Sequence, residues 1–165
     1  MPSITPCLWF DRDAERAAEL YVSVFPRSEV LSVSRYGPGM PGPLQEGDAL
    51  TVQVSLDGNA FTLLNGGPQF PHSEAVSFQI ACADQEETDR YWDRLTADGG
   101  QESMCGWLKD PFGVSWQVVP TELPALLSDP VPARAQAATQ AMLSMRRIVV
   151  ADVLAAADAA APPQG

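Results

Sequence analysis

The sequence contains few of the residues from which metal centres and disulfide frameworks are built. It has one histidine, His72, in 165 residues, so no site can take two histidines from one chain. Its three cysteines, Cys7, Cys82 and Cys105, are odd in number and widely spaced, unlike those of a disulfide framework or a zinc knuckle. We therefore expect a reduced protein in a cytoplasmic setting.

Basic residues are also scarce. Ten Lys and Arg residues stand against twenty-one Asp and Glu residues, for a net charge of −11. This balance argues against nucleic acid and anionic membranes as partners, because no basic surface is available to neutralise phosphates. No apolar run approaches the roughly 20 residues of a membrane-spanning helix. The first residues lack the basic and long apolar regions of a secretory signal, so we expect none.

Several nucleotide-binding and catalytic motifs are absent. There is no G-x-G-x-x-G after a predicted strand, no G-x-x-x-x-G-K and no G-x-S-x-G. These absences argue against a dinucleotide site, a P-loop and a serine-hydrolase nucleophile. A glycine-rich loop of the kind that holds adenosylmethionine is also missing, so we expect no methyl transfer from that cofactor.

The residues that are present predict a repeated α+β architecture. Residues 1–66 read as a strand, a helix that Asp13 caps and that runs to Phe25, and three strands, the last two joined by the tight turn Asp57-Gly58. Residues 67–122 repeat the order, with a helix that Asp84 and Glu87 cap and that Gly99-Gly100 ends. We predict two βαβββ modules within one structural domain.

Residues 123–165 differ in composition and predict a C-terminal helical extension. Helices are expected at 133–145 and 153–160, with an extended stretch from Ile148 to Val150. Met142, Leu143 and Met145 form an adaptable apolar surface. This surface packs either on the chain's own core or on a second subunit, and we favour dimer contacts.

The segment richest in candidate functional side chains runs from Cys105 to Gln117. Trp107 and Trp116 either wall a small-molecule cavity or fill a core. Gln117, among apolar neighbours, needs a hydrogen-bonding partner and lies either in a cavity or at a solvated sheet edge. Cys105 next to Gly106 is a small packing residue or, less favoured, a nucleophile that Lys109 activates.

Three stretches resemble the PhnB-like family, which is often labelled 3-demethylubiquinone-9 3-methyltransferase-like. They are Val76–Leu95 followed by Gly99-Gly100, the run Cys105-Gly-Trp-Leu-Lys-Asp with Trp116-Gln117, and Ser128–Arg147. This family belongs to the vicinal oxygen chelate, or glyoxalase/bleomycin-resistance, superfamily. The resemblance implies paired βαβββ modules that enclose a cavity, and a homodimer as the usual assembly.

The resemblance also indicates where relatives hold a divalent metal. These positions fall near Thr5 or Pro6, around Leu63–Asn65, at Ser77 and at Gln117. Side chains of these types cannot supply the three or four strong donors that such an ion needs. We therefore expect no metal and no cofactor.

The leading prediction is a metal-independent small-molecule-binding protein of this superfamily, with or without an enzymatic activity. The alternatives are an isomerase or lyase of glyoxalase type, in which Lys109, Gln117 and backbone amides stabilise an oxyanion, and an antibiotic-sequestering protein of the resistance type. No catalytic residue is assigned. The candidate cavity residues are Trp9, Asn65, Ser77, Cys105, Trp107, Lys109, Trp116 and Gln117.

Overall fold

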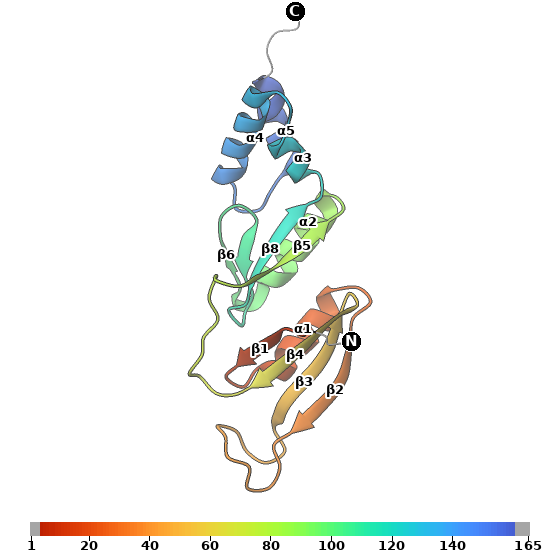
Figure 1. Ribbon diagram of the computed structural model, residues 1–165, viewed down its shortest axis with the longest axis vertical. Coiled ribbons are helices and arrows are strands. Elements are labelled where there is room, and N and C mark those ends of the chain that lie inside the picture. The colour runs from red at the N-terminus through yellow and green to blue at the C-terminus, as the bar shows by residue number, and fades with distance from the viewer. Residues whose placement is uncertain (1–3, 161–165) are drawn as a thin grey trace, which may run out of the picture. The chain divides into compact units, whose positions relative to one another are not determined.

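The first of the two four-stranded sheets has the strand order β1-β4-β3-β2. In the computed structural model, which describes residues 4–160, the chain divides into two units between His72 and Ser73. The first unit follows the predicted order of strand, helix and three strands (Figure 1), with elements β1 (Cys7–Phe10), α1 (Ala14–Val24), β2 (Glu29–Arg35), β3 (Ala49–Leu56) and β4 (Asn59–Asn65). Strand β1 runs parallel to β4, and the other pairs are antiparallel.

The β3–β4 hairpin confirms the predicted turn. Asp57 and Gly58 have φ angles of 47° and 82°, and two consecutive positive φ values suit the tight turn between twisted strands. The register pairs Leu56 with Asn59 and Thr51 with Leu64. The hairpin therefore fixes which side chains of β3 and β4 share a face.

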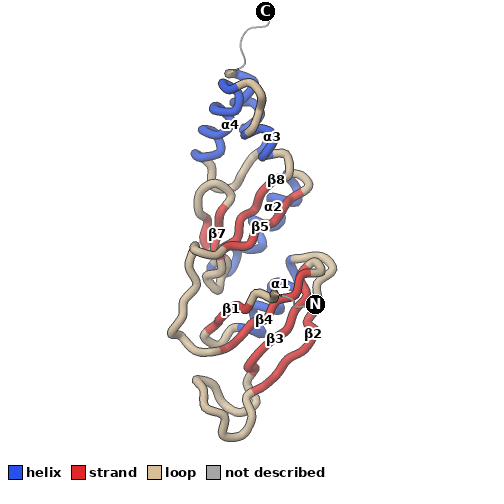
Figure 2. The backbone as a smooth tube through the Cα atoms, in the orientation of Figure 1, coloured by secondary structure: helices blue, strands red, loops and turns tan. Residues whose placement is uncertain are grey.

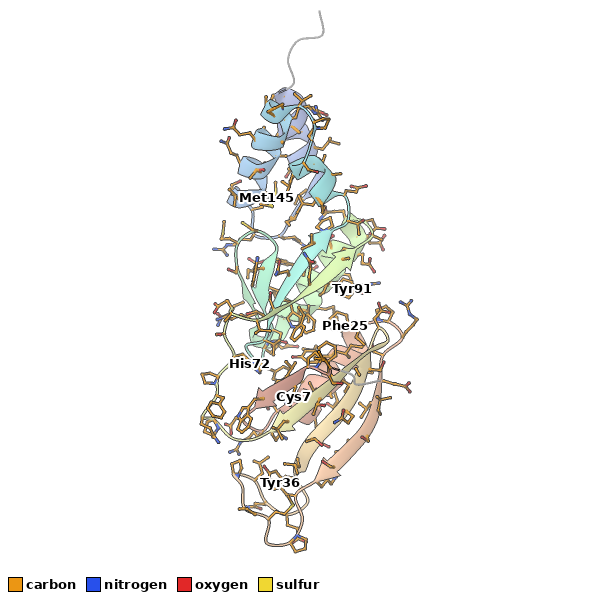
Figure 3. The ribbon with its side chains drawn as sticks, in the orientation of Figure 1. Cys7, Phe25, Tyr36, His72, Tyr91 and Met145 are labelled. Carbon is orange, nitrogen blue, oxygen red and sulfur yellow. The ribbon has the colours of Figure 1, made fainter. Side chains whose placement is uncertain are left out.

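Helix α1 covers one face of the first sheet. Its buried residues recur at helical spacing, as in Ala14, Ala17 and Tyr21. They pack against the buried positions of β3 and β4, whereas the alternate positions of these strands remain partly exposed on the other face. Figure 3 labels Tyr36 after the end of β2, and its hydroxyl donates to the main-chain oxygen of Asn65 at 2.9 Å.

The second sheet repeats this arrangement in the strand order β5-β8-β7-β6. Its opening strand is parallel to its last strand, as in the first unit. Its elements are β5 (Ser77–Cys82), α2 (Gln85–Thr96), the 3-10 turn η1 (Ala97–Gly99), β6 (Gln101–Glu102), β7 (Trp107–Lys109) and β8 (Ser115–Pro120). The duplicated βαβββ order that the sequence predicts is thus present.

Local side-chain hydrogen bonds begin and end these elements. The Asp84 carboxylate accepts from Glu87 N at 2.8 Å, as predicted, and Glu87 Oε2 accepts from Ala83 N at 2.7 Å. At the turn before β8, Asp110 Oδ1 accepts from the main-chain N–H groups of Phe112 and Val114. These hydrogen bonds fix the start of α2 and the turn before β8.

The C-terminal segment packs against its own unit. Helices α3 (Leu123–Leu127), α4 (Pro132–Ser144) and α5 (Val150–Ala159) lie together next to the second sheet (Figure 2). They enclose a core of Leu123, Ala138, Ile148, Val153 and Ala157, and Met142 and Met145 pack against it. Contact with a second subunit stays a prediction, while packing on the chain's own core is present.

Main-chain and amide hydrogen bonds attach this segment to the sheet. Cys105 N donates to Met145 O at 2.8 Å, where Figure 3 shows Met145 beside the second sheet. The Gln85 amide donates to Ile148 O and accepts from Val150 N, both at 3.0 Å. Because this amide satisfies the first N–H of α5, the helix begins at Val150, earlier than the predicted residue 153. No helix within residues 4–160 is long and apolar enough to cross a membrane.

Candidate functional site

The second sheet has a helix-covered face and an open face, and the open face gathers polar side chains. Ser115 of β8 pairs with Ser77 of β5 on one side and with Lys109 of β7 on the other. Two residues along β8, Gln117 pairs with Trp107. Since alternate residues of a strand share a face, these five side chains lie on the same side of the sheet. Four of the five, all except Ser115, are predicted candidates that the fold brings together.

Two short polar contacts connect these side chains to their surroundings. Gln117 Nε2 donates to Ser77 Oγ at 2.9 Å. Lys109 Nζ lies 2.7 Å from Glu74 Oε1, in the segment before β5. The hydrogen bond from Lys109 lowers the pKa of the Glu74 carboxyl below its ordinary value. Glu74 is therefore the ionised partner of Lys109 at neutral pH.

A pocket of about 460 Å³ opens beside this group. Its walls come from the segment before β5, from β6, from the loop between β6 and β7, and from β7 and β8. The lining residues are Glu74, Gln101, Glu102, Ser103, Met104, Cys105, Trp107, Leu108, Lys109 and Ser115. All of them belong to the second unit, so this unit contains a small-molecule-sized concavity of its own.

Glu102 lines the pocket, but its carboxylate is already engaged. Its Oε1 accepts from the Trp92 indole at 2.7 Å, and its Oε2 accepts from Arg146 at 3.3 Å. The hydrogen bond from Trp92, with a smaller contribution from Arg146, lowers the pKa of Glu102. Glu102 thus ties α2 and the C-terminal segment to β6 and offers little free charge to a ligand.

Trp116 does not lie on the open face, which corrects one of the predicted candidates. It is buried on the helix-covered face, and its indole donates to Asp110 Oδ2 at 2.9 Å. Trp116 and Gln117 are consecutive residues of one strand, and consecutive side chains point to opposite faces. Trp116 is therefore a core residue that anchors the turn before β8.

Asn65 is likewise a structural residue rather than a cavity residue. It is buried, and its Oδ1 accepts from Ala14 N while its Nδ2 donates to Ala49 O, both at 2.9 Å. The Asp13 side chain, predicted to cap α1, makes no capping hydrogen bond. Asn65 supplies this cap from the end of β4, so both ends of its amide are used within the fold.

Trp9 and Cys105 complete the placement of the candidates. Trp9 belongs to the first unit, where its indole donates to Gly67 O at 2.7 Å and its ring meets Phe70 edge-on at 5.0 Å. Cys105 lines the pocket of the second unit and has a positive φ of 58°. His72, the one histidine, packs edge-on against Phe10 in the first unit.

Sequence reasoning missed Ser115 and Glu74 as members of the site. The alternation of β8 could have placed Ser115 on the face of Gln117, because the two lie two positions apart in the strand. Glu74 carried no such signal. Its contact with Lys109 depends on the path of the chain before β5, which no local pattern encodes.

The residues at the positions where the resemblance implies metal ligands do not fit a divalent ion. Ser77 and Gln117 offer a hydroxyl and an amide that hydrogen-bond to each other, and Asn65 is engaged at α1. Within residues 4–160, no three His, Cys, Asp or Glu side chains gather where they could hold an ion. Such ions require several deprotonated or imidazole donors.

Comparisons with known proteins agree with this architecture. The family model described as 3-demethylubiquinone-9 3-methyltransferase matches residues 2–119. The solved PhnB protein from Bacillus cereus is 32% identical, with a TM-score of 0.66, and the match covers 73% of this chain and all of that one. Protein PA1353 from Pseudomonas aeruginosa is 20% identical, with a TM-score of 0.59, over 73% of this chain and 98% of that one. None of the curated proteins matches the chain.

The two βαβββ modules, each with parallel first and last strands, have the fold expected from the resemblance to the vicinal oxygen chelate, or glyoxalase/bleomycin-resistance, class. Within that class, the match over residues 2–119 is specific. The chain belongs to the PhnB-like family described as 3-demethylubiquinone-9 3-methyltransferase.

Proposed function

We propose that the protein binds a small organic molecule on the open face of its second sheet, without a metal ion. One observation carries the proposal: Ser77, Gln117, Lys109 and Trp107 share that face beside a pocket of about 460 Å³. Small-molecule sites typically combine an aromatic wall with a few well-placed polar groups. Trp107 supplies the wall, and the amide, hydroxyl and ammonium groups supply the polar contacts.

The absence of strong metal donors at Ser77 and Gln117 supports a site without an ion. Protein purified without chelators should contain less than about a tenth of an equivalent of any divalent metal, because no set of strong ligands is available to retain one. Elemental analysis by mass spectrometry measures this directly. Stoichiometric bound metal would contradict the proposal.

Binding itself is tested by native mass spectrometry and by tryptophan fluorescence. Small molecules that co-purify are identified by native mass spectrometry and then added back to the stripped protein. Gln117→Ala and Ser77→Ala should each weaken the measured affinity by about fivefold to tenfold, which corresponds to the loss of one hydrogen bond. Gln136→Ala, which changes an exposed residue of α4, serves as the control. If both variants keep the original affinity, the proposal that the ligand binds at Ser77 and Gln117 is wrong.

The same experiment separates binding from chemistry. An isomerase or lyase of glyoxalase type would return the added molecule altered, whereas a sequestering protein would return it intact. Nuclear magnetic resonance spectra of the molecule before and after incubation distinguish the two. The outcome decides whether the protein is an enzyme or a sequestering protein.

Methyl transfer, which the family description names, receives no support from the residues present. Methyltransferases commonly hold adenosylmethionine at a glycine-rich turn between a strand and a helix. The corresponding turns here contain Asp11 and Asp13 before α1 and Asp84 before α2. We expect calorimetric titration with adenosylmethionine to give no heat beyond dilution, and saturable binding would reverse this expectation.

A further inference from the structure

One hydroxyl in the pocket is buried without a hydrogen bond. Ser115 is 1% exposed, and its Oγ has no partner among residues 4–160. The neighbouring hydroxyl of Ser77 is already used by Gln117. A buried polar group that lacks a partner costs free energy, and such groups are rare in folded proteins. Because Ser115 lines the pocket, a bound molecule can supply the missing partner.

Beside Ser115 stands the single lysine of the sequence. Lys109 pairs with Ser115 across β7 and β8, and among the described pocket residues it is the only cation. Its partner Glu74 lies in the segment before β5, with 62% of its side chain exposed. Exposed ion pairs are weak, since water competes for both groups. Glu74 can therefore leave Lys109 when another anion takes its place.

We propose that this pocket takes an organic oxyanion, whose charged group replaces Glu74 on Lys109 and accepts a hydrogen bond from Ser115 Oγ. The inference rests on the proposed function and names the class of its ligand. Trp107 provides an aromatic surface for the remainder of the molecule. Glu74 then serves as an internal carboxylate that occupies Lys109 while the pocket is empty.

The other charges around the pocket are consistent with this assignment. The second carboxylate, Glu102, accepts a hydrogen bond from the Trp92 indole, and Arg146 offsets part of its charge. The net charge of −11 opposes an incoming anion at long range. At physiological ionic strength this repulsion is screened beyond about 8 Å. The contact with Lys109 therefore outweighs it inside the pocket.

The test uses three probes of the same shape and different charge: 2-naphthoate, neutral 2-naphthamide and cationic 2-naphthylmethylamine. Fluorescence titration of the full chain should show that the anion binds about tenfold more tightly than the amide, because it gains a charge-assisted hydrogen bond. The amine should bind no better than the amide. Bound 2-naphthoate should also slow acetylation of Lys109, measured by peptide mass spectrometry.

Three variants separate the roles of the pocket residues. Lys109→Met should remove the preference for the anion, and Ser115→Ala should weaken 2-naphthoate binding by about fivefold without loss of stability, since its Oγ has no partner to lose. Glu74→Gln should strengthen 2-naphthoate binding by at least about threefold, because the internal competitor loses its charge. Glu19→Gln, an equal charge change on the exposed side of α1, is the matched control.

The outcomes separate this inference from the proposed function. If all three probes bind equally and Gln117→Ala weakens them all, the site stands and the oxyanion assignment is wrong. If Glu74→Gln weakens the binding of 2-naphthoate, Glu74 is not a competitor and the inference is overturned. If no probe binds at millimolar concentration, neither the inference nor the proposed site survives.

Discussion

The two units share one architecture and differ in the role of the amide side chain on the last strand. Each last strand, β4 and β8, pairs in parallel with the opening strand of its module and carries an amide residue. In the first unit this residue is Asn65, buried on the helix side, where it caps α1 and binds Ala49 O. In the second it is Gln117, on the open face, where it binds Ser77. The last strand thus supplies a structural amide in the first unit and part of the candidate site in the second.

This difference predicts that removing the two amides has unequal effects on stability. Asn65→Ala leaves Ala14 N and Ala49 O without their partners, and it should lower the free energy of unfolding by about 2–4 kcal/mol. Gln117→Ala removes a hydrogen bond at a partly exposed position and should cost less than about 1 kcal/mol. Urea unfolding followed by circular dichroism measures both. Equal costs would make Gln117 a structural amide and would weaken the site assignment.

The contrast also shows what sequence patterns can predict. Two-residue alternation and the Asp57-Gly58 dipeptide located β3 and β4, because hairpins depend on local backbone preferences. The same alternation puts the consecutive residues Trp116 and Gln117 on opposite faces of β8. The prediction that both line one cavity conflicts with this rule, and the structure buries Trp116 on the helix-covered face.

Other parts of the site depend on contacts that no local pattern encodes. Asn65 caps α1 across 51 positions of sequence, and Glu74 reaches Lys109 through the path of a loop. The pairing of Ser115 with Lys109 and Ser77 follows from strand register, which the sequence alone did not fix. The fold could therefore be predicted from periodicity and turns, whereas the composition of the pocket required the tertiary structure.

A second difference between the units is the C-terminal segment, which adds a core to the second unit. Ile148 is buried there with Val153 and Ala157. Ile148→Val should lower the free energy of unfolding by about 1 kcal/mol, the usual cost of removing one buried methylene. Leu143→Ala, at an exposed position of α4, should change it by less than about 0.5 kcal/mol.

The same pair of variants tests the predicted dimer. If the C-terminal segment contacts a second subunit through its exposed apolar surface, Leu143→Ala should shift the sedimentation coefficient toward that of a monomer, and Ile148→Val should not. Loss of stability in Leu143→Ala that depends on protein concentration would also indicate a subunit contact, because dissociation and unfolding are then linked. A concentration-independent monomer would contradict the dimer.

The smallest expected effect compares the cysteines on the two opening strands. Cys7 begins β1 and is exposed, whereas Cys82 ends β5 and is fully buried. Burial raises the pKa of the Cys82 thiol to about 11, so only about one molecule in a thousand carries its thiolate at pH 8. Iodoacetamide at pH 8 should therefore modify Cys7 in the folded protein and leave Cys82 intact. Rapid alkylation of Cys82 would show that the β5 end of the second sheet opens readily.

The raised pKa of Cys82 also sets the direction of a pH dependence. The pKa of the unfolded thiol lies near its ordinary value of 9.0, and that of the folded thiol is raised to about 11. The burial of neutral Cys82 therefore gives its full stabilisation below about pH 9, and this contribution is lost as the pH rises toward 11. At pH 9 the loss should be under about 1 kcal/mol. Cys82→Ala should flatten this part of the unfolding profile, and Cys7→Ala should flatten it less, because burial raises the pKa of the more exposed Cys7 thiol in the same direction.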